Sequence, residues 1–286
     1  MKSKFGLLLC LFFLTIVSYA ETKPPERIIS CMPSVTEMLF ALNLSNEVVG
    51  VTTNCNFPPE AKKKEKIGGF TLNLEKIVSL KPDLVVMIAG AQNKEIKRFQ
   101  DYGLPVYTLE PLTVNAVMED LLKLGQLTGH ERSARRVVGE MESRIKAVER
   151  RTSRFRPGLG QVLELWSAKS GQRKALVIVG YNPLIVAGGG TFIDDIVNHA
   201  GVINFAGQAK AAYPHYSFEQ LINENPPYII IPRGLVGERT IKNDERWQSL
   251  EAVRNDRVLF IDPDILSRPG PRVALAIEQI SDFIYK

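Results

Sequence analysis

A helix followed by a buried strand is predicted twice in this chain, and the distance between the two copies is constant. In the first copy Asn73 suits a helix N-cap, Lys81-Pro82 ends the helix, and the apolar run from Leu84 to Met87 is typical of a buried strand. The apolar residues of this helix recur at helical spacing, at Leu74, Ile77, Val78 and Leu80.

The second copy keeps the same order. Ser217 takes the cap position, Pro226 ends the helix, and another apolar run follows. Pro226 lies 144 residues after Pro82, as Glu219 does after Glu75. The pattern therefore predicts two structurally similar halves. A length of 286 residues with 45% hydrophobic and 23% charged residues suits a globular protein of two domains.

The first twenty residues have the features of a secretory signal. Lys2 and Lys4 precede an apolar run from Phe5 to Val17, and Ser18-Tyr19-Ala20 offers a cleavage site before Glu21. A membrane anchor needs about 20 apolar residues, whereas this run has 13. We therefore expect a secreted protein.

The cysteines suggest one disulfide in the mature chain. Cys10 lies inside the apolar run after Leu9, not after the small residue that lipid attachment requires. Cys31 and Cys55 each follow a predicted strand, and the carboxyl ends of neighbouring parallel strands lie close together. A bridge between them would contribute about 3 kcal/mol. Two buried free thiols are the alternative.

Apolar strands alternate with helices along the mature chain, which predicts parallel sheets with right-handed crossovers. In the first half a capping box of Ser34 and Glu37 begins a helix at Pro33. The remaining strands of this half are Arg27–Ser30, Glu47–Thr53 and Pro105–Leu109, with a helix at Asn93–Asp101. In the second half the strands are Ala175–Val179, Leu184–Ala187 and Arg257–Ile261, and the helices are Thr191–Ala200, Asn243–Leu250 and one from Pro271 onward.

Between the halves lie two amphipathic helices. Thr113–Leu127 is followed by a helix from His130 to about Arg151, long enough to span about 30 Å. We therefore expect two doubly wound α/β lobes joined by a long rigid helix. The expected segments are a signal peptide (1–20), an N-terminal lobe (21–112), linking helices (113–156) and a C-terminal lobe (157–286). Phe155–Arg173 fits either a strand or a helix.

The sequence gives little support to catalysis or to metal binding. Gly188-Gly189-Gly190 does not complete a dinucleotide-binding pattern, because Ile193 stands at its last glycine position. Ser34 has no histidine near it in sequence and is better explained as a helix cap. The three histidines fall on different elements, so we expect no metal site and no cofactor. A net charge of +5, or +3 without Lys2 and Lys4, does not favour nucleic acid.

Four segments, in this order, resemble periplasmic substrate-binding proteins of the cobalamin, haem and iron-siderophore importers, with the vitamin B12 binders as the most similar members. The segments are 28–37, the 73–75 and 81–85 pair, 187–194 and 268–272. The resemblance implies a monomer that is not an enzyme, holds its ligand between two lobes with little hinge closure, and delivers it to an ABC permease and its ATPase. It favours a corrinoid, with haem or a ferric siderophore as alternatives. A secreted α/β enzyme and a sensor domain are the other classes.

The resemblance also assigns a role to the paired glutamates of the repeated helix. In the family, glutamates at the positions of Glu75 and Glu219 dock onto arginines of the two permease subunits. The alternative is structural, because a carboxylate in a first turn is favoured by the helix dipole by about 0.3 to 1 kcal/mol.

Ligands of parallel sheets bind beyond the carboxyl ends of the strands. Aromatic side chains suit a flat macrocycle because they bury a large area at low entropic cost. The predicted ligand-binding residues in such loops are Pro33, Phe57, Phe70, Tyr181, Tyr213 and His215.

Overall fold

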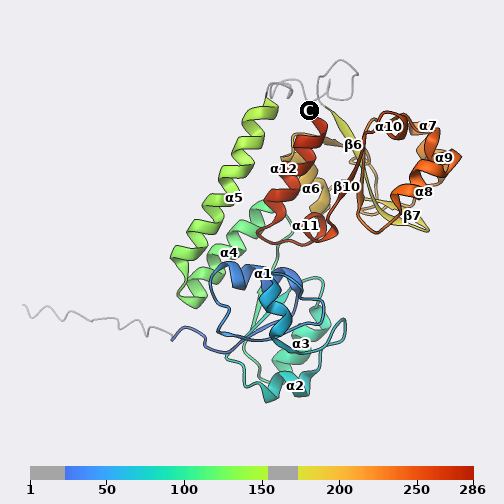
Figure 1. The fold of residues 1–286 in the computed structure, drawn as a ribbon. Coiled ribbons are helices and arrows are strands. Elements are labelled where there is room, and N and C mark those ends of the chain that lie inside the picture. Colours follow the sequence, from blue (N-terminus) through green and yellow to red (C-terminus); the bar gives the residue numbers. More distant parts are fainter. Residues whose placement is uncertain (1–22, 154–172) are drawn as a thin grey trace, which may run out of the picture.

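Residues 23–153 and 173–286 are described by the structure, a computed structural model. They form two α/β lobes beside a pair of helices (Figure 1). The N-terminal lobe comprises residues 23–112 and the C-terminal lobe residues 173–286. The predicted signal segment with Cys10 and nearly all of the ambiguous stretch 155–173 lie outside the described residues. The expected fold class, two α/β lobes with a long joining helix, is confirmed.

The N-terminal lobe is built on a five-stranded sheet in which every pair is parallel. Its order is β3 (Glu65–Lys66), β2 (Val48–Val51), β1 (Ile28–Ser30), β4 (Leu84–Ile88) and β5 (Val106–Leu109). Its helices are α1 (Pro33–Ala41), the 3₁₀ helix η1 (Pro59–Lys63), α2 (Leu74–Ser79) and α3 (Asn93–Asp101). Both β3 and η1 fall in a stretch without a clear sequence pattern.

The C-terminal lobe repeats this plan with one departure. Its order is β10 (Val258–Ile261), β9 (Ile229–Pro232), β6 (Lys174–Tyr181) and β7 (Leu184–Val186), and β8 (Ile203–Asn204) pairs with the start of β6. The expectation of a wholly parallel sheet is wrong here, because β7 runs antiparallel to β6. Only Asn182 and Pro183 separate the two strands, which is too short for a parallel crossover.

The helices of the C-terminal lobe are mostly short. They are α6 (Phe192–His199), α7 (Phe218–Glu224), α8 (Glu238–Asn243), α9 (Glu245–Gln248), α10 (Glu251–Arg254), α11 (Pro263–Ser267) and α12 (Val273–Ile284). The helix predicted over Asn243–Leu250 is present but shorter, as α9. Helix α8 ends at Asn243, and α9 begins after Asp244, whose side chain accepts from the Arg246 N–H at 2.9 Å.

The repeated helix and strand are confirmed in both lobes. Asn73 caps α2 by accepting from the Lys76 N–H, and Ser217 caps α7 by accepting from the Gln220 N–H, each at 2.9 Å. The strands that follow, β4 and β9, are each bonded to the central strand of their sheet, β1 or β6. The helix and its strand therefore occupy equivalent places in the two sheets.

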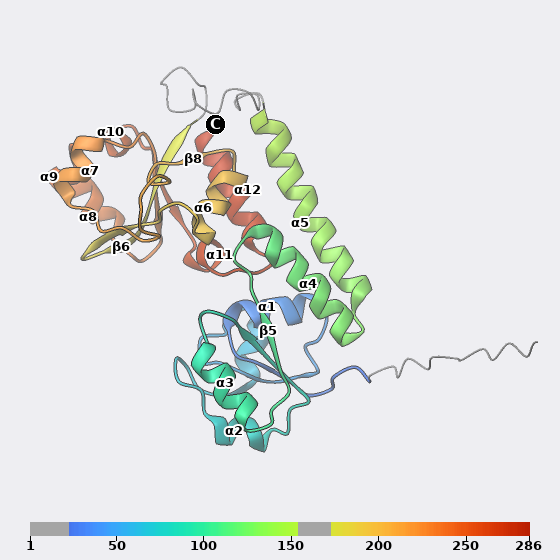
Figure 2. The ribbon, with the colours of Figure 1, turned by 180° about the vertical axis from the view of Figure 1, so that it is seen from behind.

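Two long helices, α4 (Val114–Thr128) and α5 (Glu131–Thr152), connect the lobes. The 22 residues of α5 rise about 33 Å. Between them Gly129 has φ of 72°, a conformation that glycine adopts without cost. Figure 2 shows α4 beside α5, and α5 also contacts α12 and α1. No helix in the described part of the chain is long and apolar enough to span a membrane.

The core follows the two faces of the sheets. Along β4, Leu84, Val86 and Ile88 belong to the largest apolar cluster, whereas Val85 and Met87 belong to a smaller cluster on the other face. This alternation is the period of a strand buried on both sides. The largest cluster also contains residues of α1, α4, α5, α6 and α12, so it continues from one lobe to the other.

Candidate functional site

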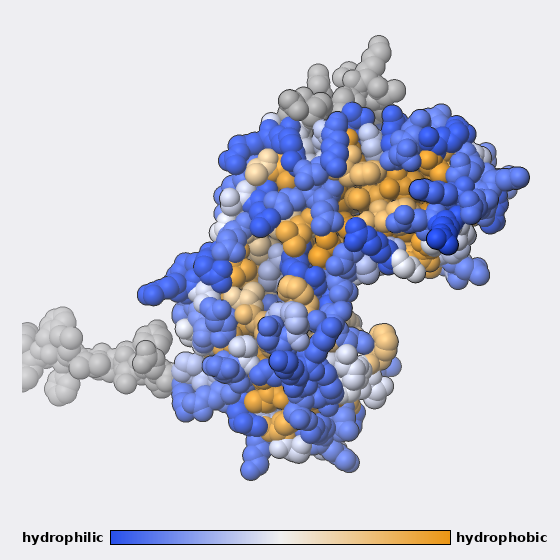
Figure 3. All heavy atoms as spheres, viewed as in Figure 1, coloured by the Kyte–Doolittle hydropathy of each residue, from blue (hydrophilic) through white to orange (hydrophobic). Residues whose placement is uncertain are grey.

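The facing surfaces of the two lobes are built by the loops at the carboxyl ends of the strands. Helix α1 follows β1 and α11 follows β10, and these two helices lie on facing sides of the lobes (Figure 1). The strand order reverses around β1 in one lobe and around β6 in the other. Such switch points are the usual binding crevices of open parallel sheets. Figure 3 shows the surface hollowed between the lobes, on the side away from α5.

A set of polar side chains, here called the interlobe network, bonds the lobes to each other. It consists of Glu37 and Asn56 from the N-terminal lobe and Asp264, Arg268 and Arg272 from the C-terminal lobe. Arg272 donates two hydrogen bonds to the Glu37 carboxylate, at 2.8 and 2.7 Å, and Arg268 donates a third at 3.2 Å. Arg268 also donates to the Asn56 side-chain oxygen at 2.6 Å.

Asp264 completes the network by contacting both Arg268 and Asn56. This carboxylate forms an ion pair with Arg268 at 2.8 Å and accepts from the Asn56 amide at 3.1 Å. Only 2% of the Glu37 side chain is exposed, and each arginine side chain is 16% exposed. The hydrogen bonds to Glu37 raise the pKa of Arg272. Two carboxylates therefore neutralise two guanidinium groups around the buried Glu37.

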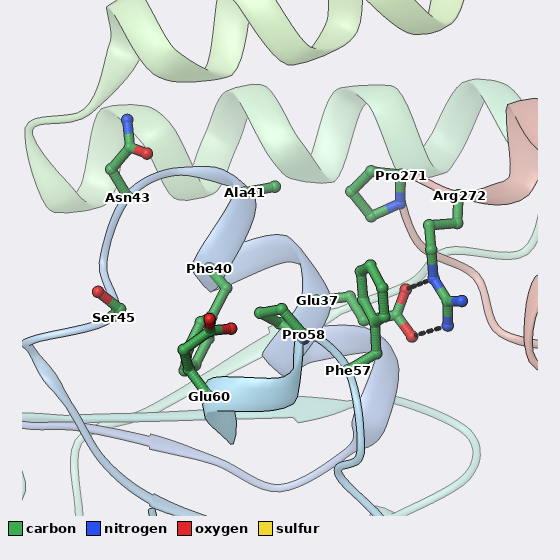
Figure 4. Close-up of a pocket in the computed structure, with 10 residues that line it drawn as sticks. All are labelled: Glu37, Phe40, Ala41, Asn43, Ser45, Phe57, Pro58, Glu60, Pro271 and Arg272. Atoms are coloured by element: carbon green, nitrogen blue, oxygen red, sulfur yellow. Dashed lines mark hydrogen bonds and ion pairs between the residues drawn. The ribbon is translucent and has the colours of Figure 1, made fainter. Parts of the chain in front are cut away.

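A cavity of about 380 Å³ lies beside the network (Figure 4). It is lined by Glu37, Phe40, Ala41, Asn43, Ser45, Phe57, Pro58, Glu60, Pro271 and Arg272. The Arg272 guanidinium lies 3.9 Å from the centre of the Phe57 ring. One face of this predicted ligand-binding ring is therefore already covered by a cation, an arrangement that aromatic rings favour.

The structure places the other predicted residues of the N-terminal lobe at the same sheet end. Pro33 is the first residue of α1, directly beyond β1 and Met32, and is half-buried. Phe70 lies in the loop after β3, and 99% of its side chain is exposed. Gln92 ties the ends of β1 and β4 together, because its amide donates to the Cys31 carbonyl and accepts from the Ile88 N–H. The carboxyl end of this sheet is thus a fixed platform.

The predicted residues of the C-terminal lobe do not gather in one place. Tyr181, at the carboxyl end of β6, is half-buried and stacks on Trp247 with ring centres 6.3 Å apart. Segment 212–216 runs beside β7 along the edge of the sheet, since Val186 donates to the Pro214 carbonyl and Tyr216 to the Leu184 carbonyl. Tyr213 is 51% exposed on this segment. His215 is exposed there and lines a separate groove of about 500 Å³ with β8 and α7.

The predicted disulfide is not formed. Cys31 and Cys55 are both free, with exposures of 1% and 2%. The Cys55 sulfur lies 3.1 Å from the hydroxyls of Thr36 and Thr52. Burial, and to a lesser degree the nearby Cys55 thiol, raise the pKa of Cys31. Both cysteines therefore serve as buried apolar groups of the core.

The capping role expected of Ser34 is also wrong. Met32 occupies the N-cap of α1, no side chain caps the helix, and Pro33 takes its first position, where a missing N–H costs nothing. Ser34 is only 2% exposed, and Glu37 joins the interlobe network instead of completing a capping box. Within residues 23–153 and 173–286, no three His, Cys, Asp or Glu side chains are grouped to hold a metal ion.

The paired glutamates take equivalent positions. Glu75 and Glu219 are each the second residue of their helix, in α2 and α7, and both are exposed. Each of these helices precedes a strand parallel to the centre of its sheet, so its first turn lies toward the carboxyl end. The structure thus presents one carboxylate per lobe in a matched setting.

The interlobe network was missed at the sequence level. Its arginines are four residues apart in the segment 268–272, and Glu37 ends the segment 28–37, so both parts were noticed as motifs. Their meeting was not predictable, because 231 residues separate Glu37 from Arg268. The spacing of Arg268 and Arg272 was the only available signal.

Comparisons with known proteins agree with this architecture. A family model described as periplasmic binding protein matches residues 28–265. An uncharacterized ABC transporter substrate-binding lipoprotein of Bacillus subtilis is 31% identical over 268 residues, covering 92% of this chain and 81% of that protein. A vitamin B12-binding protein of Vibrio cholerae is 26% identical over 285 residues, covering 97% of this chain and 96% of that protein.

A solved structure gives the same result. The periplasmic vitamin B12 binding protein of Vibrio cholerae superposes with a TM-score of 0.76 at 25% identity, covering 92% of this chain and 97% of that one. The match spans both lobes and the helices between them. The chain therefore belongs to the periplasmic binding protein family, as a substrate-binding protein of the ABC importer type.

Proposed function

We propose that this protein binds a corrinoid in the periplasm, between its two lobes, and delivers it as a monomer to an ABC permease and its ATPase. Two observations carry the proposal: the hollow between the lobes (Figure 3), and the exposed Phe70 in the loop beyond the carboxyl end of β3. A phenylalanine that is 99% exposed keeps its whole apolar surface in water. Stacking of a flat, largely apolar ring system on Phe70 would remove that surface from water, which is favourable.

The charges of the interlobe contact support a corrinoid over a ferric siderophore. Capture of an anionic siderophore calls for cations that are still free to pair with it. Arg268 and Arg272 are instead neutralised by Glu37 and Asp264 and held at fixed positions. Corrinoid side chains are mainly neutral amides, which do not require such free cations.

Haem is the second candidate, because of Tyr213 and His215. Both side chains are exposed and two residues apart, with His215 in an antiparallel bridge to Ile185 and Tyr213 at a bend just before it. Tyrosine and histidine are both axial ligands of haem iron. Both residues lie along the edge of the sheet beside β7. A haem bound there would lie outside the hollow between the lobes.

Titration of the purified ligand-free protein with cyanocobalamin, haemin and an anionic ferric catecholate siderophore tests the proposal. Absorbance and tryptophan fluorescence are the readouts. Saturable one-to-one binding of cyanocobalamin, with much weaker binding of the other two, is expected. Tight haemin binding with a Soret shift that Tyr213→Phe and His215→Ala abolish would replace the corrinoid by haem. Binding of the siderophore alone would contradict both candidates.

The paired glutamates supply the proposed contact with the permease. Glu75 and Glu219 are exposed carboxylates at matched positions of α2 and α7, one in each lobe. Opposite charges at a transient interface mainly accelerate encounter and fix orientation. Two such points, one per lobe, would align the protein over a permease made of two similar halves.

A further inference from the structure

The interlobe network is the only set of charged side chains, among the described residues, for which the structure records ion pairs between the two lobes. It joins a helix near the start of the chain to a turn near its end. The Glu37 carboxylate accepts three hydrogen bonds, and all three come from the other lobe. A bidentate arginine and carboxylate pair fixes orientation as well as distance. The network therefore defines how α1 sits against the loop between α11 and α12.

The lobes are also linked by the apolar cluster that runs through α1, α5 and α12, and by the chain itself. Residues 110–113 lead from β5 into α4. Helices α4 and α5 pack on α6 and α12, so they are attached to the C-terminal lobe. Against the N-terminal lobe, α5 contacts α1, where the exposed Asn43 amide donates to the Ser133 hydroxyl at 3.1 Å. The apolar contact between α1 and α5 keeps the lobes together, but burial of apolar surface is not directional and does not by itself fix the angle between them.

We propose that the interlobe network, and not the long helix alone, sets the angle between the lobes in the ligand-free protein. In this role Glu37 and Arg272 are positioning residues that keep the two halves of the ligand site at a fixed separation. A site that is already formed binds ligand without the cost of rearranging the lobes. If only a fraction of the molecules had the competent arrangement, the apparent affinity would be reduced by that fraction.

The charges of the network indicate how the lobes would move if Glu37 were lost. Without the Glu37 carboxylate, Arg268 would keep its ion pair with Asp264, whereas Arg272, 16% exposed, would keep only the more distant charges of Asp262 and Asp264. A largely buried cation that has lost its bonded partner is unfavourable, and separating the lobes lets it reach water. The loss of Glu37 should therefore open the molecule.

The test measures the distance between the lobes without any ligand. Lys94→Cys in α3 and Lys242→Cys in α8, both exposed, carry spin labels for a pulsed electron paramagnetic resonance measurement. The native Cys31 and Cys55 are buried and should remain unlabelled. The pair is examined in the otherwise unchanged protein, with Glu37→Gln, with Asn56→Ala and with Glu60→Gln. Glu60 is an exposed carboxylate that lines the same cavity and is the matched control.

One narrow distance distribution is expected for the unchanged protein and for Glu60→Gln. For Glu37→Gln the fraction of molecules outside that range should rise at least about tenfold. Asn56→Ala, which removes two exposed hydrogen bonds, should give an intermediate broadening. Circular dichroism and hydrogen exchange of the two sheets should stay unchanged, which separates opening of the lobes from unfolding.

An unchanged distribution in both Glu37→Gln and Asn56→Ala would overturn the proposal. If Glu37→Gln does not fold, Asn56→Ala decides alone, because its side chain is exposed and the variant should fold. The same broadening in Glu60→Gln would also contradict it. Because no ligand is present, these outcomes do not depend on which compound the protein carries.

Discussion

Lys81 and Asn225 share the left-handed backbone conformation, with φ of 48° and 43°, and Asn225 lies 144 residues after Lys81. Each follows the helix of the repeated unit and stands directly before a proline. The repeat therefore extends from side-chain pattern to backbone strain. Asparagine tolerates this conformation much better than lysine does.

Replacing Lys81 by glycine should stabilise the protein. The Lys81 side chain is exposed, so the substitution removes backbone strain of about 1 kcal/mol without loss of packing. We expect the free energy of unfolding in urea to rise by about 0.5 to 1 kcal/mol for Lys81→Gly. The gain should be smaller for Asn225→Gly and absent for Lys81→Ala. A loss of stability in Lys81→Gly would show that the strain is not there.

The docking role predicts a loss of transport coupling without a loss of ligand. The double variant Glu75→Gln/Glu219→Gln should bind its ligand normally but fail to stimulate the ATPase of its permease, and each single variant should be partly defective.

The matched control for docking is Glu95→Gln/Glu251→Gln. These are also first-turn glutamates, one in each lobe, so they lose the same favourable interaction with a helix dipole. Both double variants should lose at most about 1 kcal/mol per site in stability. Full ATPase stimulation by Glu75→Gln/Glu219→Gln, or equal defects in the two pairs, would leave only the structural role.

Phe70→Ala should weaken ligand binding by about 1 to 3 kcal/mol, measured by titration calorimetry. The thermal stability should hardly change, because this side chain buries nothing in the ligand-free protein. Tyr102→Ala is the control, since Tyr102 is 68% exposed in the same lobe but follows α3, outside the predicted loops. Unchanged affinity in Phe70→Ala would remove Phe70 from the site.

The buried thiol of Cys31 predicts a loss of stability at high pH. Below about pH 8.5 the thiol is protonated in both folded and unfolded chains. Above it, the unfolded chain loses a proton that the folded chain keeps, because burial raises the pKa of Cys31. The free energy of unfolding should therefore fall by up to about 1.4 kcal/mol per pH unit. Urea unfolding between pH 8 and 10 should show this slope, flattened in Cys31→Ala.

Thiol titration checks the same site in another way. Two equivalents should react in unreduced, denatured mature protein, and almost none in the native protein, since Cys31 and Cys55 are buried and free. No reaction after denaturation would show that the bridge forms in the periplasm after all.

Sequence reasoning succeeded where the cause of a structure lies within a few residues. The caps Asn73 and Ser217 are predictable because an N-cap side chain bonds to a backbone N–H only three residues ahead. Both strands of the repeated unit are predictable because a strand buried on two faces consists of consecutive apolar residues. The antiparallel β7 was also within reach, since the two residues before it allow only a hairpin. The alternation of strands and helices, from which parallel sheets were expected, does not hold for this pair of strands.

The candidate site was harder to predict because its contacts join distant segments. Glu37 fits a capping box locally, and nothing near it in sequence points to Arg272, which is 235 residues away. Tyr213 and His215 were expected in a loop beyond a strand, whereas backbone hydrogen bonds draw segment 212–216 alongside β7. The short helices α8, α10 and α11 contain at most six residues, too few to show a helical period.

The continuous apolar cluster determines how the protein unfolds. Because that cluster runs through both lobes and the connecting helices, melting either lobe exposes apolar surface belonging to the other. Heating should therefore give one cooperative transition instead of two. The outer clusters are separate from it, and they carry α2 in one lobe and α7 in the other. Each outer face can thus open and reclose by itself at a cost below that of global unfolding, while the centre of the molecule stays intact.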